Sequence, residues 1–387
     1  MALTLEICRN VVSEIGSRND LARLCQVSQG FRTFAERALY NTLYMRNVQE
    51  TLLLCRTLSY TARIAALVDA LTIYTAAEVD SSLEESGSSD EESEPPQELP
   101  HNYWSCVARA LEQTINLQYL NIHIANSTNA DAAWALSKCT FQLRGFHCDL
   151  NWDNHLISFL NKQTDLDDLY LLDYIDSGNA STPASEGTPS NRPPSLSSAA
   201  FPHLSTLECT FSEAAIAITP GRPITRLKTC FSRTRVDEKR TELTELLTKV
   251  RQSSRSLRAL DIADSEYTTS FSMELLSSIV ASRATSSELR YLGTLVLPIS
   301  GRERLQFYGL LMRLPRIQCV EVEVSDWIPP PSSPPAFRAL ASEMRLYTPS
   351  VSRVVFVHNF DRTVVSVVDG VCRMDNDASC ELLWRET

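Results

Sequence analysis

The sequence predicts an α/β protein with a short helical start and a long alternation of strands and helices after it. Two observations carry this prediction. The first 45 residues place apolar side chains at helical spacing, and an apolar-x-x-apolar-x-apolar pattern then recurs along the chain, with amphipathic helical stretches between its copies. Hydrophobic residues make up 43% of the 387, enough to bury one large core or two unequal ones.

Residues 1–45 are predicted to form three short helices. Thr4 is a candidate N-cap for the first helix, and Gly16 ends its apolar run. Ser17 and Asp20 match a capping box, in which an acid follows the capping Ser by three residues. Gly30 is expected to interrupt the second helix. The apolar positions of the third helix are Phe31, Phe34, Ala35, Ala38, Leu39 and Leu43.

The recurring pattern predicts strands, because its last two apolar positions alternate as on one face of a sheet. Its copies are Val68/Leu71/Ile73, Leu117/Leu120/Ile122, Leu143/Phe146/Cys148, Leu166/Leu169/Leu171, Leu204/Leu207/Cys209, Leu257/Leu260/Ile262, Ile317/Val320/Val322 and Val351/Val354/Phe356, with a blurred copy at Leu289/Leu292 and Leu295/Leu297. Several copies continue to a polar residue eight positions after the first, at Asn151, Ser212, Ser265, Ser325 and Asn359.

Two stretches between copies have a clear helical face. The stretch 236–252 presents Leu243, Leu246, Leu247 and Val250. The stretch 300–315 is expected to open with a capping box at Ser300 and Glu303 and to bury Leu305, Leu310, Leu311 and Leu314. A strand, a polar turn and a returning helix make one leucine-rich-repeat unit, and stacked units bury their apolar faces together as a solenoid. A conventional α/β domain is the alternative.

Two segments are predicted to be disordered inserts, because they are too polar to offset their ordering entropy. One is the acidic, Ser-rich 78–100, and the other is the Ser/Pro-rich loop 177–199. The predicted organisation is therefore a helical domain at 1–45, the start of the solenoid at 46–77, the acidic insert, and the rest of the solenoid at 101–387. A shorter proline-rich run, 329–335, favours an extended loop.

Charge and cysteine usage restrict the partners and the compartment. The net charge is −11, but residues 78–98 hold nine acids and no Lys or Arg, so the remainder carries only −2. Without a basic field, nucleic acid is not an expected partner. The eleven Cys are scattered without C-x-x-C pairs, which indicates reduced thiols in a cytoplasmic or nuclear protein. A signal peptide and a membrane-spanning run are not apparent, so no membrane partner is expected.

Catalytic and metal-binding patterns are absent from the sequence. It contains no P-loop, G-x-S-x-G, H-E-x-x-H or G-x-G-x-x-G motif, and Gly is scarce at 11 residues. The one tight His/Cys pair, His147 and Cys148, falls in a predicted strand, where core packing is the expected role. We therefore expect neither an enzyme nor a bound metal or cofactor.

The stretch "LTLEICRNVVSEIGSRNDLARLCQVSQGFRTFAERALY" resembles an F-box. Residues that match the first half of that motif are Leu3, Leu5, Glu6, Ile7 and Val11, and those that match the second half in order and spacing are Asp20, Leu21, Leu24, Val27, Ser28 and Phe31. Thr4 stands where the family has Pro. The segments "AERALYNTLY" and "TARIAALVDALTIY" are similar to those of fungal F-box proteins with irregular leucine-rich repeats. The C-terminal "VVFVHNFDRTVVSVVDGVCRMDN…LLWRE" resembles the ending of such chains and is expected to form strands.

The resemblance implies a function without chemistry of its own. An F-box binds a Skp-type adaptor and, through it, the cullin of a cullin-RING (SCF-type) ubiquitin ligase, while the repeats hold an unknown target protein. The residues that the resemblance assigns to the adaptor are Leu3, Leu5, Ile7, Val11, Leu21, Leu24, Val27 and Phe31. Truncating Leu24 and Phe31 to Ala is expected to abolish adaptor binding. The alternative is a non-catalytic interaction scaffold without a ligase role.

The acidic tract also contains a candidate for regulation. Ser88 and Ser89 each have an acid three residues on, a pattern that suits an acidophilic kinase. Phosphorylation there would deepen the negative charge of the tract. A solvated loop without regulation is the alternative interpretation.

Overall fold

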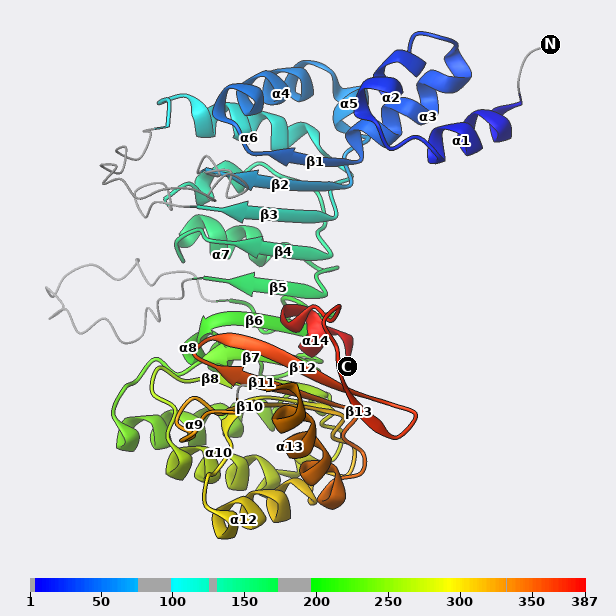
Figure 1. The fold of residues 1–387 in the computed structure, drawn as a ribbon. Coiled ribbons are helices and arrows are strands. Elements are labelled where there is room, and N and C mark those ends of the chain that lie inside the picture. Colours follow the sequence, from blue (N-terminus) through cyan, green and yellow to red (C-terminus); the bar gives the residue numbers. More distant parts are fainter. Residues whose placement is uncertain (1–3, 76–98, 125–130, 173–195, 332) are drawn as a thin grey trace, which may run out of the picture. The chain divides into compact units, whose positions relative to one another are not determined.

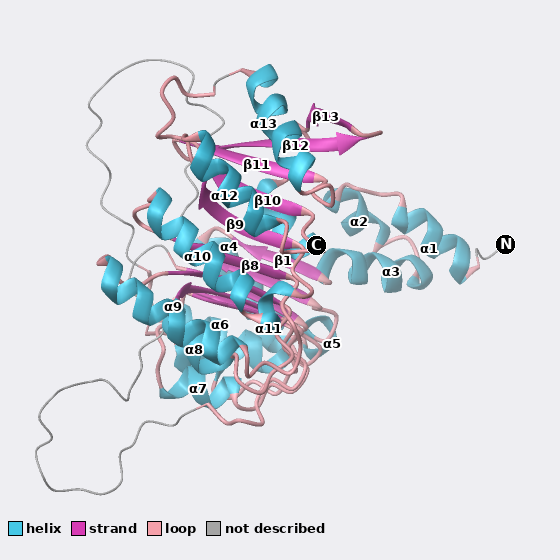
Figure 2. Ribbon diagram, turned by 90° about the horizontal axis from the view of Figure 1, so that it is seen from below, coloured by secondary structure: helices cyan, strands magenta, loops and turns pink. Residues whose placement is uncertain are grey.

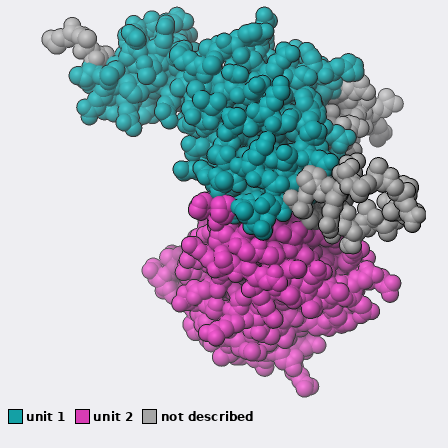
Figure 3. Space-filling view, turned by 180° about the vertical axis from the view of Figure 1, so that it is seen from behind, with its two compact units in different colours: residues 1–166, 177–201 teal, residues 167–176, 202–387 magenta. Residues whose placement is uncertain are grey.

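The structure is a computed structural model that describes residues 4–75, 99–124, 131–172, 196–331 and 333–387. It divides into two compact units, shown in different colours in Figure 3. Unit 1 holds residues 1–166 and 177–201, and unit 2 holds 167–176 and 202–387. Leu3, Ser88, Ser89 and most of both predicted inserts lie outside the described residues. Each unit combines parallel strands with helices, so the α/β class is confirmed.

The N-terminal segment forms three helices, as predicted: α1 (Leu5–Ser13), α2 (Arg18–Leu24) and α3 (Gln29–Tyr40). Thr4 caps α1, since its Oγ1 accepts a hydrogen bond from the Ile7 N–H at 3.4 Å. Ser17 caps α2 through the Asp20 N–H. The helices enclose a small core of their own, made of Cys8, Val12, Leu21, Phe31 and Ala35.

Two boundary predictions in this segment are wrong. Gly30 does not break a helix but lies in the first turn of α3, whose N-cap is Ser28. A Cβ on Gly30 would lie 3.4 Å from the Cys8 Sγ, so the missing side chain lets α1 approach α3. Leu43 is not helical either. It belongs to strand β1 (Thr42–Met45), which starts two residues after α3 ends.

Unit 1 continues as a parallel sheet. Strand β1 pairs with β2 (Ala70–Tyr74), β2 with β3 (Tyr119–His123), and β3 with β4 (Gly145–Cys148). The connections between these strands carry α4 (Val48–Tyr60), α5 (Ala62–Ala65), α6 (Tyr103–Gln113) and the 3₁₀ helix η3 (Ala133–Leu136), and α7 (Asn154–Leu160) follows β4. Strand order therefore follows chain order (Figure 1).

Unit 2 repeats this arrangement over more strands. Its parallel strands are β5 (Asp168–Leu171), β6 (Thr206–Phe211), β7 (Arg226–Cys230), β8 (Ala259–Ala263), β9 (Tyr291–Val296), β10 (Cys319–Glu323) and β11 (Arg353–His358). The intervening helices are α8 (Ser212–Ile218), α9 (Val236–Val250), α10 (Thr269–Ala281), α11 (Arg283–Ser286), α12 (Gly301–Leu311) and α13 (Pro334–Tyr347). Helices α9, α10 and α12 lie on one face of the sheet (Figure 2).

The chain then turns back on itself. Strand β12 (Asp361–Val368) pairs antiparallel with β11, and β13 (Val371–Met374) pairs antiparallel with β12. The 3₁₀ helix η4 (Cys380–Leu382) and α14 (Leu383–Glu386) follow. The C-terminal stretch that the sequence assigned only to strands therefore also supplies two short helical turns.

The strand register aligns the apolar positions of the sequence pattern. In unit 1, Leu71 lies opposite Leu120, and Leu120 opposite Phe146. In unit 2 an unbroken row of neighbours crosses the parallel strands on their helix-covered side: Leu169, Leu207, Leu227, Leu260, Leu292, Val320 and Val354. All members of this row are nearly inaccessible to solvent. Strand β7 was missed by the sequence pattern because Thr229 stands at its third apolar position.

The helix predictions hold in part. Helix α9 buries Leu243, Leu246, Leu247 and Val250 as expected. In and just after helix α12, Leu311 and Leu314 are buried as predicted, but Leu305 is 52% exposed, and Phe307 and Tyr308, which were not predicted, are buried. Ser300 makes no side-chain cap. The proline-rich run is not a loop over its whole length, since α13 begins at Pro334.

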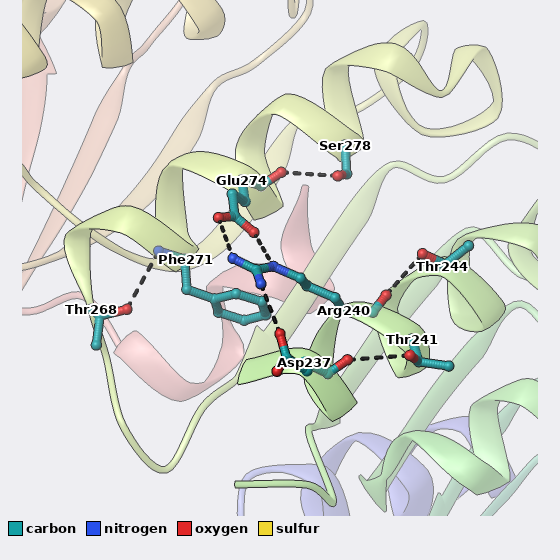
Figure 4. Close-up of polar contacts among 8 residues, drawn as sticks. All are labelled: Asp237, Arg240, Thr241, Thr244, Thr268, Phe271, Glu274 and Ser278. Atoms are coloured by element: carbon teal, nitrogen blue, oxygen red, sulfur yellow. Dashed lines mark hydrogen bonds and ion pairs between the residues drawn. The ribbon is translucent and has the colours of Figure 1, made fainter. Parts of the chain in front are cut away.

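Neighbouring helices of unit 2 are joined by a forked ion pair at the surface (Figure 4). Arg240 of α9 donates from Nε and Nη2 to the two carboxylate oxygens of Glu274 on α10, at 2.7 and 2.8 Å, and from Nη1 to Asp237 at 3.0 Å. The hydrogen bonds from Arg240 lower the pKa of Glu274. Below this pair, Lys239 forms a buried ion pair with Asp264.

The polar ninth positions do not form one continuous ladder. Asn151 donates to Asp131, the buried Ser212 donates to Glu242, and Ser325 accepts from the Asn359 backbone N–H. Ser265 is exposed. These three hydrogen bonds join residues 20, 30 and 34 positions apart, so the polar residues that make them link successive segments of the chain and do not close local turns.

Candidate protein-interaction surfaces

The helical segment leaves several large apolar side chains in solvent. The exposed fractions are 63% for Leu5, 45% for Ile7, 39% for Val11 and 64% for Val27. Ile7 and Val11 are one turn apart on α1 and therefore share a face. Leu5 lies beside the start of α3, because its Cδ2 is 3.5 Å from the position of a Cβ on Gly30. We call Leu5, Ile7, Val11 and Val27 the N-terminal apolar surface.

Two residues expected at this surface are instead part of the core. Leu21 is 5% exposed and Phe31 is 7% exposed, and both pack with Cys8, Val12 and Ala35. The expectation that they face outward is wrong, because three short helices have few large side chains and need these two to hold together. Leu24 is half-buried against the same core. Sequence spacing predicted the elements but not which side of each helix is covered.

Ion pairs connect α3 to the start of the sheet in unit 1. Arg63 of α5 forms a forked pair with Glu36, which lowers the pKa of that carboxyl, and Arg37 lies 3.4 Å from Asp69, just before β2. Both arginines are largely exposed, so each pair contributes little free energy. Their effect is to orient α3 relative to the strands.

A hollow of about 500 Å³ between the three helices and the start of β1 has a different chemistry. Its lining includes three arginines, Arg9, Arg18 and Arg37, and the apolar residues Val12, Ile15, Leu21 and Phe34. Arg18 is held by a 2.7 Å hydrogen bond to the Leu39 carbonyl oxygen. The helical segment therefore presents an apolar face and a basic hollow.

The outward face of the unit 1 sheet, opposite the apolar row, is polar and aromatic. Tyr44 is 56% exposed and Tyr119 is 48% exposed. The Tyr119 ring lies over Gly145 on the next strand, where a Cβ would come within 2.9 Å of it. Tyr74 and His123 stack with ring centroids 5.0 Å apart. Exposed tyrosines on a rigid sheet are typical of protein-binding faces.

Over β8–β10 the outward face of the unit 2 sheet is largely buried instead, and it encloses acids. Asp261 of β8 is 6% exposed and Glu321 of β10 is 2% exposed. Gly293 of β9 makes room for them, since a Cβ there would lie 1.9 Å from the Asp261 Oδ1. Glu321 accepts from the Thr294 hydroxyl at 3.0 Å and pairs with Arg362 of β12 at 3.2 Å.

The two acids share one small buried volume, which changes the proton affinity of Asp261. Burial, with the Glu321 charge as the second cause, raises the pKa of Asp261 to about 7, although Lys228 and Arg362 oppose the shift. Sequence analysis missed this cluster. Its only signal was the charged residue between the apolar positions of each strand, at Asp261 and Glu321.

Cysteines and histidines show no sign of a metal centre in the described part of the chain. No group of three or more His, Cys, Asp or Glu side chains there could hold an ion. All eleven Cys are free thiols. Burial raises the pKa of Cys148 and Cys209 to about 12, as expected for thiols that pack as small apolar groups. Cys148 points inward, and its neighbour His147 is half-buried on the other face.

No family model matches this chain, and no curated protein matches its sequence. Among the described residues, no helix is both long and apolar enough to cross a membrane.

Proposed function

We propose that this protein is the substrate-recognition subunit of a cullin-RING ubiquitin ligase. In this proposal the N-terminal helices bind a Skp-type adaptor, which links the chain to a cullin, and the sheet holds a target protein. The protein performs no chemistry itself. It accelerates ubiquitin transfer by raising the concentration of the target near the loaded conjugating enzyme.

The N-terminal apolar surface is the observation that carries this proposal. Val27 and Leu5 are exposed although they lie in a segment with its own core, so solvent contacts side chains that a partner could bury. Both residues are among those that match the F-box motif, Leu5 in its first half and Val27 in its second half. Thr4, which replaces the family's Pro, caps α1 and so supports the same helix start.

We propose further that each strand and its following helix form one divergent leucine-rich repeat. The aligned apolar row in each unit and the match between strand order and chain order support this reading. Target binding is then assigned to the outward face of β1–β4, because Tyr44 and Tyr119 are available there and the corresponding face of unit 2 is covered.

A pair of matched substitutions tests adaptor binding. Ile7→Asp combined with Val27→Asp places charges on the N-terminal apolar surface without entering the helical core, and should lower co-purification with a Skp-type adaptor at least tenfold. Leu24→Ala with Phe31→Ala is a less informative test, because removing the Phe31 ring from the core costs about 3–5 kcal/mol and unfolds the helices as well.

The control is Leu53→Asp on α4, which alters a side chain that is 66% exposed, much like Val27. It should leave adaptor binding at the wild-type level. Equal adaptor recovery with the double variant and the wild type would show that the N-terminal apolar surface is not the adaptor-binding face. No adaptor recovery with the wild type would leave the protein as an interaction scaffold without a ligase role.

A further inference from the structure

The segment after β13 folds back onto the outward face of the unit 2 sheet (Figure 1). Its last element, α14, has only four residues and could not persist as an isolated helix. Its conformation is therefore set by the surface beneath it. We call residues 379–387 the C-terminal cover.

Two adjacent side chains of the cover supply the apolar contact. Leu383 and Trp384 are each 2% exposed. They pack on the first residues of three neighbouring strands, Ala259, Tyr291 and Cys319. These strand residues point away from the apolar row, so the cover closes a second, smaller core on the opposite side of the sheet.

The next residue supplies an ionic contact. Arg385 donates to Asp168 on β5 and, at 2.7 Å, to Glu208 on β6. Its guanidinium also lies 4.5 Å from the centroid of the Trp384 ring. Lys228 on β7 pairs with Glu208 at 3.0 Å and lies 5.8 Å from the same ring, so acids and cations alternate around the indole.

The last two residues of the cover make longer polar contacts than Arg385 does. Glu386 reaches Arg353 at 3.4 Å, and the Thr387 carbonyl oxygen accepts from Arg226 at 3.2 Å. The buried Nε of Arg226 has no hydrogen-bond partner among the residues described. Burial and the nearby positive charges of Arg258 and Arg290 lower the pKa of Arg226. The positive charges of Arg226, Arg258 and Arg290 therefore lie near the last residues of the cover and are not fully neutralised by acids.

The cover can leave without breaking the sheet. Strands β5 to β11 pair with one another, and the cover contributes no strand to their hydrogen-bonded ladder. Its contacts are made by a few side chains of one short segment, which is the arrangement that favours local opening over global unfolding.

We propose that the outward face of β5–β10 is a peptide-recognition surface. In this proposal the C-terminal cover binds that surface within the same molecule, in the place of an external peptide. The external partner it fits is a peptide segment with a large aliphatic residue, a tryptophan and an arginine in succession. Tryptophan and arginine are the side chains that most often dominate binding free energy at protein interfaces. The acids Asp168 and Glu208 select the arginine, and the apolar site formed by Ala259, Tyr291 and Cys319 selects the two residues before it.

The cover then sets a threshold for binding. An external segment must displace a competitor that is permanently tethered and therefore present at high effective concentration. This inference concerns unit 2 alone and does not depend on the ligase role.

The test uses a fluorescent synthetic peptide of residues 376–387 and the intact chain. Trp384→Ala combined with Arg385→Ala removes both anchors of the cover and should open the face. We expect the opened chain to bind the peptide at least tenfold more tightly than the wild-type chain, by fluorescence anisotropy. A peptide with Glu in place of the arginine at 385 should bind the opened chain at least tenfold more weakly than the parent peptide.

Two further variants make the result decisive. Leu382→Ala alters an exposed residue of the same segment and should leave the face closed. A chain that ends at Ala378 lacks the cover altogether and should bind the peptide as the double variant does. If neither opened chain binds the peptide, or if the wild-type chain binds it equally well, the proposal is overturned.

Discussion

The two units have the same strand pattern on their helix-covered sides but differ on their outward sides, which are exposed in unit 1 and covered in unit 2. In unit 1 the outward face carries solvent-exposed rings such as Tyr44 and Tyr119. In unit 2 the equivalent positions, among them Tyr291 and Cys319, are buried beneath residues from the end of the chain. The same apolar pattern therefore occurs both beside an open surface and beside a second core. The residues between the apolar positions decide which of the two forms.

The difference matters for where binding specificity resides. Residues that face the helices are mostly apolar in every strand, so they carry little information about a partner. The outward residues are free of that constraint. In unit 1 they offer tyrosines to solvent, and in unit 2 they form an apolar site with the buried acids Asp261 and Glu321 beside it.

The largest expected effect comes from removing the aromatic side chain that covers unit 2. Trp384→Ala should lower the free energy of unfolding by about 3–5 kcal/mol, the usual cost of deleting a buried aromatic ring. Tyr119→Ala on the open face of unit 1 should cost about 1 kcal/mol or less. Urea denaturation followed by circular dichroism measures both. Equal losses of unfolding free energy for the two variants would contradict the contrast between the covered face of unit 2 and the open face of unit 1.

Two glycines on the outward faces provide a second comparison. Gly293→Ala should destabilise the protein by about 1–3 kcal/mol, because its Cβ would lie 2.8 Å from the Asp261 Cα, a backbone atom that cannot move aside. Gly145→Ala should cost less, since its Cβ would meet only the half-exposed Tyr119 ring, which can turn away. A larger loss for Gly145→Ala in thermal unfolding would contradict this view of unit 1.

The smallest effect is a pH dependence confined to unit 2. Since the pKa of Asp261 rises on folding from 3.8 to about 7, the folded state holds a proton that the unfolded state releases. This contribution to stability is complete below about pH 4 and is lost as the pH rises through 7. Between pH 5 and pH 7 the free energy of unfolding should fall by roughly 2 kcal/mol from this group, because the folded state binds nearly one more proton than the unfolded state and each pH unit is then worth about 1.4 kcal/mol.

Asp261→Asn supplies the control for this pH effect. An amide cannot ionise, so the variant should lose that part of the pH slope and exceed the wild type in stability above pH 7. The groups that face Asp261 are Glu321, Lys228, Arg362 and Glu208, and all of them remain in the variant. An unchanged slope in urea titrations at pH 5 and pH 7 would assign the proton to another group.

Sequence patterns predicted the elements better than the surfaces. Thr4 and Ser17 cap helices as expected because capping needs only a side-chain oxygen and a local turn. Leu21 and Phe31 were placed outward, although they are core, because a helix with apolar residues on two sides does not reveal which side meets its neighbours. Strand β7 was not predicted because a buried Thr fills its third apolar position, and the pattern requires an apolar residue there.

The sequence by itself determined the strand and helix alternation, the presence of three N-terminal helices with the caps of the first two, and most of the row of apolar residues beneath the sheet. These follow from local spacing, since each depends on residues only a few positions apart. Only the tertiary structure decided which outward face stays open, because Arg385 meets Asp168 across 217 positions of the chain and Trp384 reaches strands far earlier in the sequence. Contacts of that range leave no periodic trace in a single sequence.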